Sequence, residues 1–253
     1  MELHSLIAAP RNLKEGIDWL VALKGDDAEN NFKAMATAVH KFLADKPVGK
    51  MELRDLEDVK SVSKEFLMQL EVHHHPYVKD LLTRYNVAMD RNLGFFDRAF
   101  KDIAISDYEN VLQTQSIEPE TIAENLGKVV HSTEKFLDYI KRTRRYNRTY
   151  SLQATWASSC THDPEVCAVV LVGIAPMLYA GLRCLIDAAA DAFMEGPASI
   201  QEHSLISVLE TLGYEGQPKR GKVRSSDIRS ALSDVNKDVL NVLYDLAGFW
   251  AFY

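Results

Sequence analysis

The feature that most constrains the fold is a run of 17 residues without a charged side chain, from Val166 to Leu182. Pro176 interrupts the run, which is shorter than the ~20 residues that a membrane-spanning helix usually needs. Beyond the run, Arg183, Asp187 and Asp191 recur every four residues and form one polar stripe on a helix. This pattern favours a central helix that is buried in the protein and then becomes amphipathic. A membrane span is the alternative.

Capping and breaking residues divide the rest of the chain into helices. Asn12 and Glu15 have the spacing of a capping box, Asp163-Pro164 is a helix start, and Gly196-Pro197 is a helix end. Apolar residues three and four positions apart mark the helices between such signals. The expected helices cover 12–25, 27–44, 55–72, 76–106, 119–147, 163–194, 199–213 and 226–246, with a kink or an end near Gly94.

No segment alternates as a half-buried strand does, and glycine (12) and proline (8) are scarce for 253 residues. We therefore expect an all-α fold, a multi-helix bundle of about nine helices with a buried central apolar helix. One helical domain would span 1–253; a subdivision into N-terminal helices (1–112) and a C-terminal bundle (113–253) is the alternative. The aromatic tail, LAGFWAFY, should pack against the core or lead into a further segment.

Composition narrows the class of partner. Apolar residues make up 47% and charged residues 26%, which is ordinary for a globular protein. The formal net charge is -7, with 29 basic and 36 acidic residues, and nucleic-acid binding needs a basic surface. The sequence therefore predicts no nucleic-acid partner.

The three cysteines are Cys160, Cys167 and Cys184. An odd number is typical of a reducing compartment, or of one disulfide with a spare thiol. If one pair forms a disulfide, Cys160 and Cys167 are the nearest in sequence; otherwise all three are free and mostly buried. With His162 they offer three zinc ligands, but no fourth follows, so we expect no metal and no cofactor.

Two polar clusters stand out. His73, His74 and His75 point in different directions on a helix and read as a polar helix end. Residues 141–148 carry five cations in eight positions, at the end of an expected helix, where cations suit the helix dipole. If a ligand binds electrostatically anywhere, we expect it at this basic run, through Arg142, Arg144, Arg145 and Arg148.

No catalytic motif is visible: there is no GxSxG, phosphate-binding loop, HExxH, kinase signature or GxGxxG. No spacing singles out a nucleophile and its base. The sequence thus predicts no enzymatic activity and no catalytic residue. The N-terminus has no basic region followed by a long apolar run, so no ordinary signal peptide is visible.

Three segments carry a resemblance. The first is PRNLKEGIDWL, from Pro10 to Leu20; the second is Cys167-Ala168 followed by LVGIAPMLYAGL, from Leu171 to Leu182; the third runs from Leu209 to Tyr214 and ends in Leu-Gly-Tyr. In this order they resemble segments of the variant erythrocyte surface antigen family of Babesia parasites, or of a related piroplasm surface or exported antigen. The first of the three is the most specific.

The resemblance implies display at the surface of the infected erythrocyte or of the parasite, with roles in antigenic variation, immune evasion and adhesion to host cells. Its partners would be a host-cell receptor or other protein, and antibodies. Family members are longer, richer in cysteine and end in a membrane span. The expectation is therefore a truncated ectodomain or a short member, attached to a membrane only through an anchor not present in this chain.

No catalytic residue carries over from the family, and its recognisable positions read as fold-forming: Asn12, Leu13, Ile17, Trp19 and Pro176. Adhesion would then use exposed loops, expected at 46–50, 150–162 and 215–225, with Trp156 as an aromatic anchor beside the basic run. Two other classes stay open. One is an intracellular or secreted all-α scaffold that binds a host or parasite protein, with a cytoplasmic location as an alternative. The other is an enzyme with an unrecognised helical site.

Overall fold

The computed structural model describes residues 2–87, 104–143, 146–196, 200–214 and 223–253. The predicted kink at Gly94 and the predicted helix start at Ser199 lie outside these residues, as does 215–222, most of the third predicted loop. Within them the fold is all-α, with nine helices of seven or more residues and no named strand. A single bridge between Leu3 and Tyr150 is isolated. The predicted fold class is confirmed.

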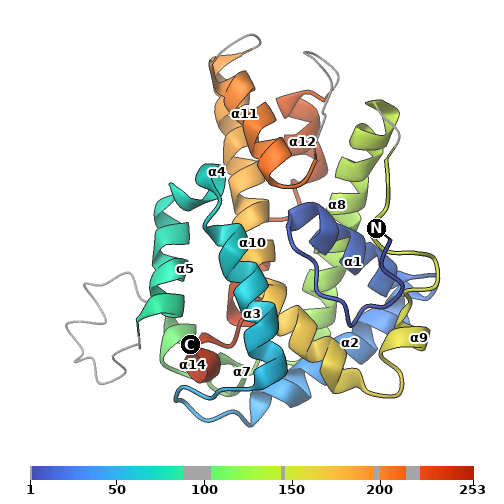
Figure 1. The fold of residues 1–253 in the computed structure, drawn as a ribbon, viewed down its shortest axis with the longest axis vertical. Helices are drawn as coiled ribbons and strands as arrows, with labels where there is room; N and C mark the ends of the chain where they lie inside the picture. Colours follow the sequence, from blue (N-terminus) through green and yellow to red (C-terminus); the bar gives the residue numbers. More distant parts are fainter. Residues whose placement is uncertain (1, 88–103, 144–145, 197–199, 215–222) are drawn as a thin grey trace.

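Helix α10 (Pro164–Glu195) is the centre of the bundle (Figure 1). Asp163 and Pro164 begin it and Gly196, at φ 84°, ends it, as its local signals predict. Among the described helices it is the one long and apolar enough to cross a membrane, and 83% of its most apolar 18-residue window is buried inside the protein. Its apolar run is thus covered by the neighbouring helices.

Helices α1 (Leu13–Lys24) and α2 (Ala28–Ala44) cover one side of α10, and α8 (Pro119–Thr143) packs on both of them. Asn12 caps α1 by accepting a hydrogen bond from the Glu15 N–H, and Gly25 ends that helix. Pro119 begins α8, as predicted. Helix α2 packs between α8 and α10, so these four helices share one interior.

Helices α3 (Arg54–Leu67), α4 (Leu70–His73) and α5 (Pro76–Asn86) cover another side. The single helix predicted over 55–72 is wrong, because the backbone becomes extended at Gln69. The break turns α4 so that Val72 is fully buried, whereas Leu70 is 81% exposed. His75 and Pro76 begin α5 as predicted.

The C-terminal part forms α11 (Ile200–Thr211), α12 (Ser225–Ala231), α13 (Lys237–Asp245) and α14 (Phe249–Phe252). The helix predicted over 226–246 is wrong in extent: it is divided in two, and the Asn236 side chain caps α13. The tail is buried, as expected, with Trp250 donating to the Lys46 carbonyl and the N–H of Gly49 donating to the Trp250 carbonyl.

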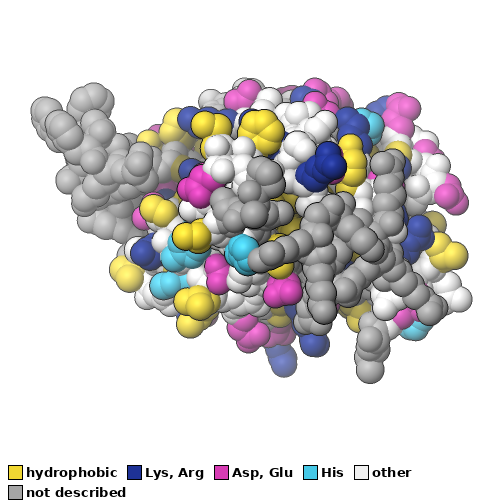
Figure 2. Space-filling view, turned by 90° about the horizontal axis from the view of Figure 1, so that it is seen from above, with side chains coloured by type: hydrophobic (Ala, Val, Ile, Leu, Met, Phe, Trp, Pro, Cys, Tyr) yellow, Lys and Arg dark blue, Asp and Glu magenta, His cyan; other side chains and the backbone are white. Residues whose placement is uncertain are grey.

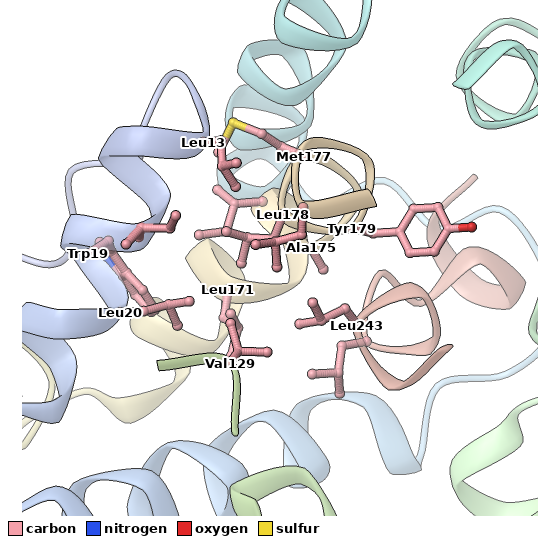
Figure 3. Packing of buried hydrophobic residues seen from close by; sticks show 14 of the residues in the cluster. Leu13, Trp19, Leu20, Val129, Leu171, Ala175, Met177, Leu178, Tyr179 and Leu243 are labelled. Atoms are coloured by element: carbon pink, nitrogen blue, oxygen red, sulfur yellow. The ribbon is translucent and has the colours of Figure 1, made fainter. Parts of the chain in front are cut away.

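Short helical turns complete the fold: η1 (Ile105–Asp107), α7 (Val111–Thr114) and α9 (Trp156–Ser159). The buried apolar residues form one cluster that includes helices from both sides of residue 112 (Figure 3). Helix α10 contacts α2 and α3 from the N-terminal part and α11, α12 and α13 from the C-terminal part. One interior therefore serves the whole described chain.

Candidate functional site

The three segments that carry the sequence resemblance meet in space. Helix α1 lies against the middle of α10, where Leu13 lies near Met177 and Leu178 (Figure 3). A Cβ atom added to Gly16 would lie 2.8 Å from Leu178 Cδ2. Small residues thus let the two helices approach closely.

The third segment closes the end of this contact. The Lys14 N–H donates to the Leu212 carbonyl, and Gly213, at φ 99°, lies so near the Asn12 side chain that a Cβ atom would be 2.6 Å from its Oδ1. Leu13, Ile17 and Trp19 are fully buried. These positions form the fold, as we predicted.

Asp18 ties α1 to the chain that follows α8. Its carboxylate is almost fully buried and accepts from Lys14 Nζ (2.9 Å), from the Tyr146 hydroxyl (2.6 Å) and from the Thr149 N–H (2.9 Å). A buried carboxylate needs such partners, because burial without them is costly. The Asp18 carboxylate therefore serves the fold, because its oxygens already accept these hydrogen bonds.

Only part of the predicted adhesive surface lies within the described residues. Arg142 lies in the last turn of α8, Arg144 and Arg145 are outside the described residues, and Arg148 is exposed. Trp156 is only 9% exposed, because Thr155 caps α9 and the turn packs Trp156 inward. Trp156 as an exposed anchor is therefore wrong.

The segment 150–162, predicted as an exposed loop, is largely anchored. Tyr150, Ala154 and Cys160 are buried, and the Tyr150 hydroxyl donates to the Ala8 carbonyl. Leu152, at 83% exposed, is the apolar exception. The segment is therefore exposed only in part.

Cys160 and Cys167 are joined by a disulfide, which connects the end of α9 to the first turns of α10. This is the pair that is nearest in sequence. Because both sulfurs form this disulfide, neither can join His162 as a zinc ligand. Among the described residues no group of three or more His, Cys, Asp or Glu side chains could hold a metal ion.

Cys184 is a buried free thiol on α10, and its sulfur lies 3.4 Å from His75 Nε2. Burial raises the pKa of the thiol to about 12 and lowers the pKa of the His75 imidazole. Both groups are then neutral at pH 7, whereas a nucleophilic cysteine needs its thiolate. The sequence did not reveal this contact, because His75 and Cys184 are 109 positions apart.

A groove of about 930 Å³ lies between the N-terminal segment, α3 and the start of α10. Both helices rise from the lower end of the molecule in Figure 1. Nine apolar residues line the groove: Leu3, Ile7, Ala8, Ala9, Val59, Val62, Val166, Val169 and Val170. Its volume lies within the ~300–1,000 Å³ of typical ligand sites.

The rim of the groove is acidic. Five carboxylates line it, from Glu15, Asp55, Asp58, Asp163 and Glu165, against the single guanidinium of Arg11. Glu15 accepts a hydrogen bond from the backbone N–H of Arg11 at 2.8 Å. The other four carboxylates, which we call the rim acids, are exposed, and no described residue forms an ion pair or side-chain hydrogen bond with them.

Other large apolar side chains are also exposed, among them Met68, Leu70, Phe193, Met194 and Ile200. Seen from the end formed by α11 and α12, the visible apolar side chains stand between acidic, basic and histidine side chains (Figure 2). Scattered apolar residues of this kind are normal on a soluble protein, whereas a contiguous apolar surface marks a binding site. The groove is therefore the candidate functional site.

Sequence reasoning missed the groove, because its lining comes from four separate segments. One signal was available on α3, where Asp55, Asp58, Val59 and Val62 have the i, i+3, i+4, i+7 spacing of one helix face. Comparison of the chain with family models, with curated proteins and with solved structures finds no match.

Proposed function

We propose that this chain is a non-enzymatic recognition protein displayed at the surface of the infected erythrocyte or of the parasite. There it would take part in adhesion to host cells and in antigenic variation. The recognition role is carried by one observation, the groove beside α3 and α10. It is open, lined by nine apolar residues and bordered by four exposed carboxylates that have no ion-pair partner among the described residues.

The proposed location starts from the resemblance of the three segments to surface antigens. The disulfide between Cys160 and Cys167 supports it, because such bonds persist in oxidising compartments and are rare in the cytosol. The Cys184–His75 contact supplies no thiolate to an enzymatic alternative, because burial raises the pKa of the thiol and lowers the pKa of the imidazole.

The location is tested by antibody labelling of intact infected cells. We expect labelling without permeabilisation. Labelling that needs permeabilised membranes would contradict surface display and favour an intracellular scaffold.

The compartment is tested independently by counting thiols in protein taken from those cells. After denaturation without a reductant, alkylation and mass spectrometry should modify Cys184 and leave Cys160 and Cys167 joined. Modification of all three cysteines would contradict an oxidising compartment.

A further inference from the structure

We propose that the groove binds a basic amphipathic helix of a partner protein. This inference rests on the proposed recognition function and specifies the chemistry of the partner. Its first support is the shape of the site. Asp55, Asp58, Val59 and Val62 lie along one face of α3, and Asp163, Val166, Val169 and Val170 lie along one face of α10.

Two such helix faces at one groove can bind a third helix, because side-chain ridges of one helix fit grooves on its neighbours. The floor is made of small residues, valines and alanines, which leave room for larger apolar side chains from the partner. Ile7, at 50% exposed, forms part of one wall. A guest helix with a leucine-like stripe would cover these groups.

The charges select the sign of the guest. Asp55 and Glu165 lie in the first turns of α3 and α10, Asp163 precedes α10, and Asp58 lies in the second turn of α3. The acids thus gather where the two helices begin, and the valines follow further along. The dipoles of the two helix N-termini stabilise these acids, but they supply no counter-charge that could pair with them.

A guest with lysine or arginine beside its apolar stripe would supply those counter-charges. An acidic peptide, a nucleic acid or an anionic lipid surface would be repelled by the rim acids. Charge complementarity therefore favours a basic helical segment over these other occupants.

The test uses the full chain and three fluorescent synthetic peptides of about 14 residues, a helix of about 20 Å. The first has leucines on one helical face and lysines on its flanks. The second has the same composition in an order that spreads the leucines around the helix. The third carries glutamate in place of lysine. Binding is measured by fluorescence anisotropy at several salt concentrations.

We expect the first peptide to bind most tightly and to lose affinity as salt rises. The double variant Asp55→Asn with Glu165→Gln should weaken this binding about tenfold at low salt. The matched control is Glu120→Gln with Asp238→Asn, which removes the same charge from the first turns of α8 and α13. The control should leave the affinity unchanged.

A second variant tests the floor without removing a charge from the rim. Val62, half-buried on α3, is replaced by lysine, which would place a cation under the guest, or by isoleucine, which would not. The Val62→Lys change should abolish binding of the first peptide and the Val62→Ile change should preserve it. Circular dichroism of each variant checks that it is folded.

Equal binding of the first two peptides, binding of the third, or equal losses in the two charge variants would overturn the proposed partner chemistry. Surface labelling of intact cells would still stand in that case, so the recognition function at the surface would survive with another ligand. Labelling confined to permeabilised cells would remove the surface function whatever the peptides do.

Discussion

The middle of helix α10 packs closely against its neighbours, whereas its beginning lines an open groove. Along the middle, from 171 to 182, α1 and α3 come close enough that glycines are required, and the nearby carboxylate of Asp18 has three donors. Along the beginning, from 163 to 170, valines line an open groove and the rim acids have no described partner. Helix α10 thus has a closely packed contact along its middle and an open apolar surface along its beginning.

The difference between the two regions distinguishes an acidic residue that the fold buries from acidic residues that it leaves exposed. Where the fold needs an acid, it buries and pairs it, because an unpaired buried charge is costly. The rim acids stay exposed beside apolar side chains without an ion-pair partner among the described residues, so they contribute to the fold mainly through the helix dipoles. Substitutions in the middle of α10 and its contacts should therefore damage stability, whereas substitutions around the groove should damage binding.

The largest expected effect is at Asp18. Replacing Asp18 with alanine removes the acceptor of the Tyr146 hydroxyl and of the Thr149 N–H, and it removes the carboxylate that pairs with Lys14 Nζ. We expect a loss of about 3 kcal/mol in the free energy of unfolding, measured with urea. Asp26→Ala, at an exposed position after α1, is the control and should change stability by less than about 0.5 kcal/mol. Similar losses in both variants would show that Asp18 is not a structural acid.

The next effect concerns the glycines. In Gly173→Ala the new Cβ atom would lie 2.5 Å from Val59 Cγ1 and 2.7 Å from Val59 Cβ, so α3 must move. Such overpacking should cost about 1–3 kcal/mol. Gly127→Ala in α8, where the nearest atom is Phe32 Cδ2 at 3.9 Å, should instead stabilise the protein by about 0.5–1 kcal/mol. Thermal unfolding of the two variants gives the comparison, and a change of the same sign in both would contradict the close α3–α10 contact.

Asp245, the last residue of α13, is more exposed than Asp18 and less exposed than the rim acids. It is largely buried, and no described cation forms an ion pair with it; burial raises the pKa of its carboxyl group to about 6. The folded protein then holds this proton more tightly than the unfolded chain, so stability should fall as pH rises from about 4 to 6 and stay lower above that range. Asp245→Asn removes this penalty and should stabilise the protein by about 1–2 kcal/mol at pH 8. The gain should vanish near pH 4 in urea titrations, and an equal gain at both pH values would exclude this carboxyl as the cause.

The smallest effect on stability is expected at the groove. The variant Asp55→Asn with Glu165→Gln loses two first-turn acids, whose interaction with a helix dipole is worth about 0.3–1 kcal/mol each. The control pair Glu120→Gln with Asp238→Asn should lose a similar amount in urea unfolding. A much larger loss in the groove pair would mean that the rim acids serve the fold.

Local chemistry explains which parts of this fold could be predicted from sequence. Asn12, Asp163-Pro164 and Gly196 mark helix ends through caps and backbone restrictions that act within a few residues. The break at Gln69 could not be predicted in this way, because the apolar period continues through it and the packing of α4 on α11 decides. The burial of Trp156 depends likewise on contacts far away in the chain.

The candidate site was hidden for the same reason. Its valines read as ordinary core residues on their own helices, and its acids read as first-turn acids that suit a helix dipole. Only the folded chain brings the α3 face, the α10 face and the N-terminal segment together. The sequence drew attention instead to the basic run at 141–148, because clustered charge is visible without a fold.

The most direct test of this contrast within α10 is methyl NMR of the full chain during titration with the leucine–lysine peptide. We predict shifts of the Ile7, Val62, Val166 and Val169 methyl groups, with Val172, Leu178 and Leu182 in the closed middle of α10 unchanged. Shifts that appear instead at the exposed residues Leu70, Met194 and Ile200, with the groove methyl groups unchanged, would contradict this contrast between the two parts of α10.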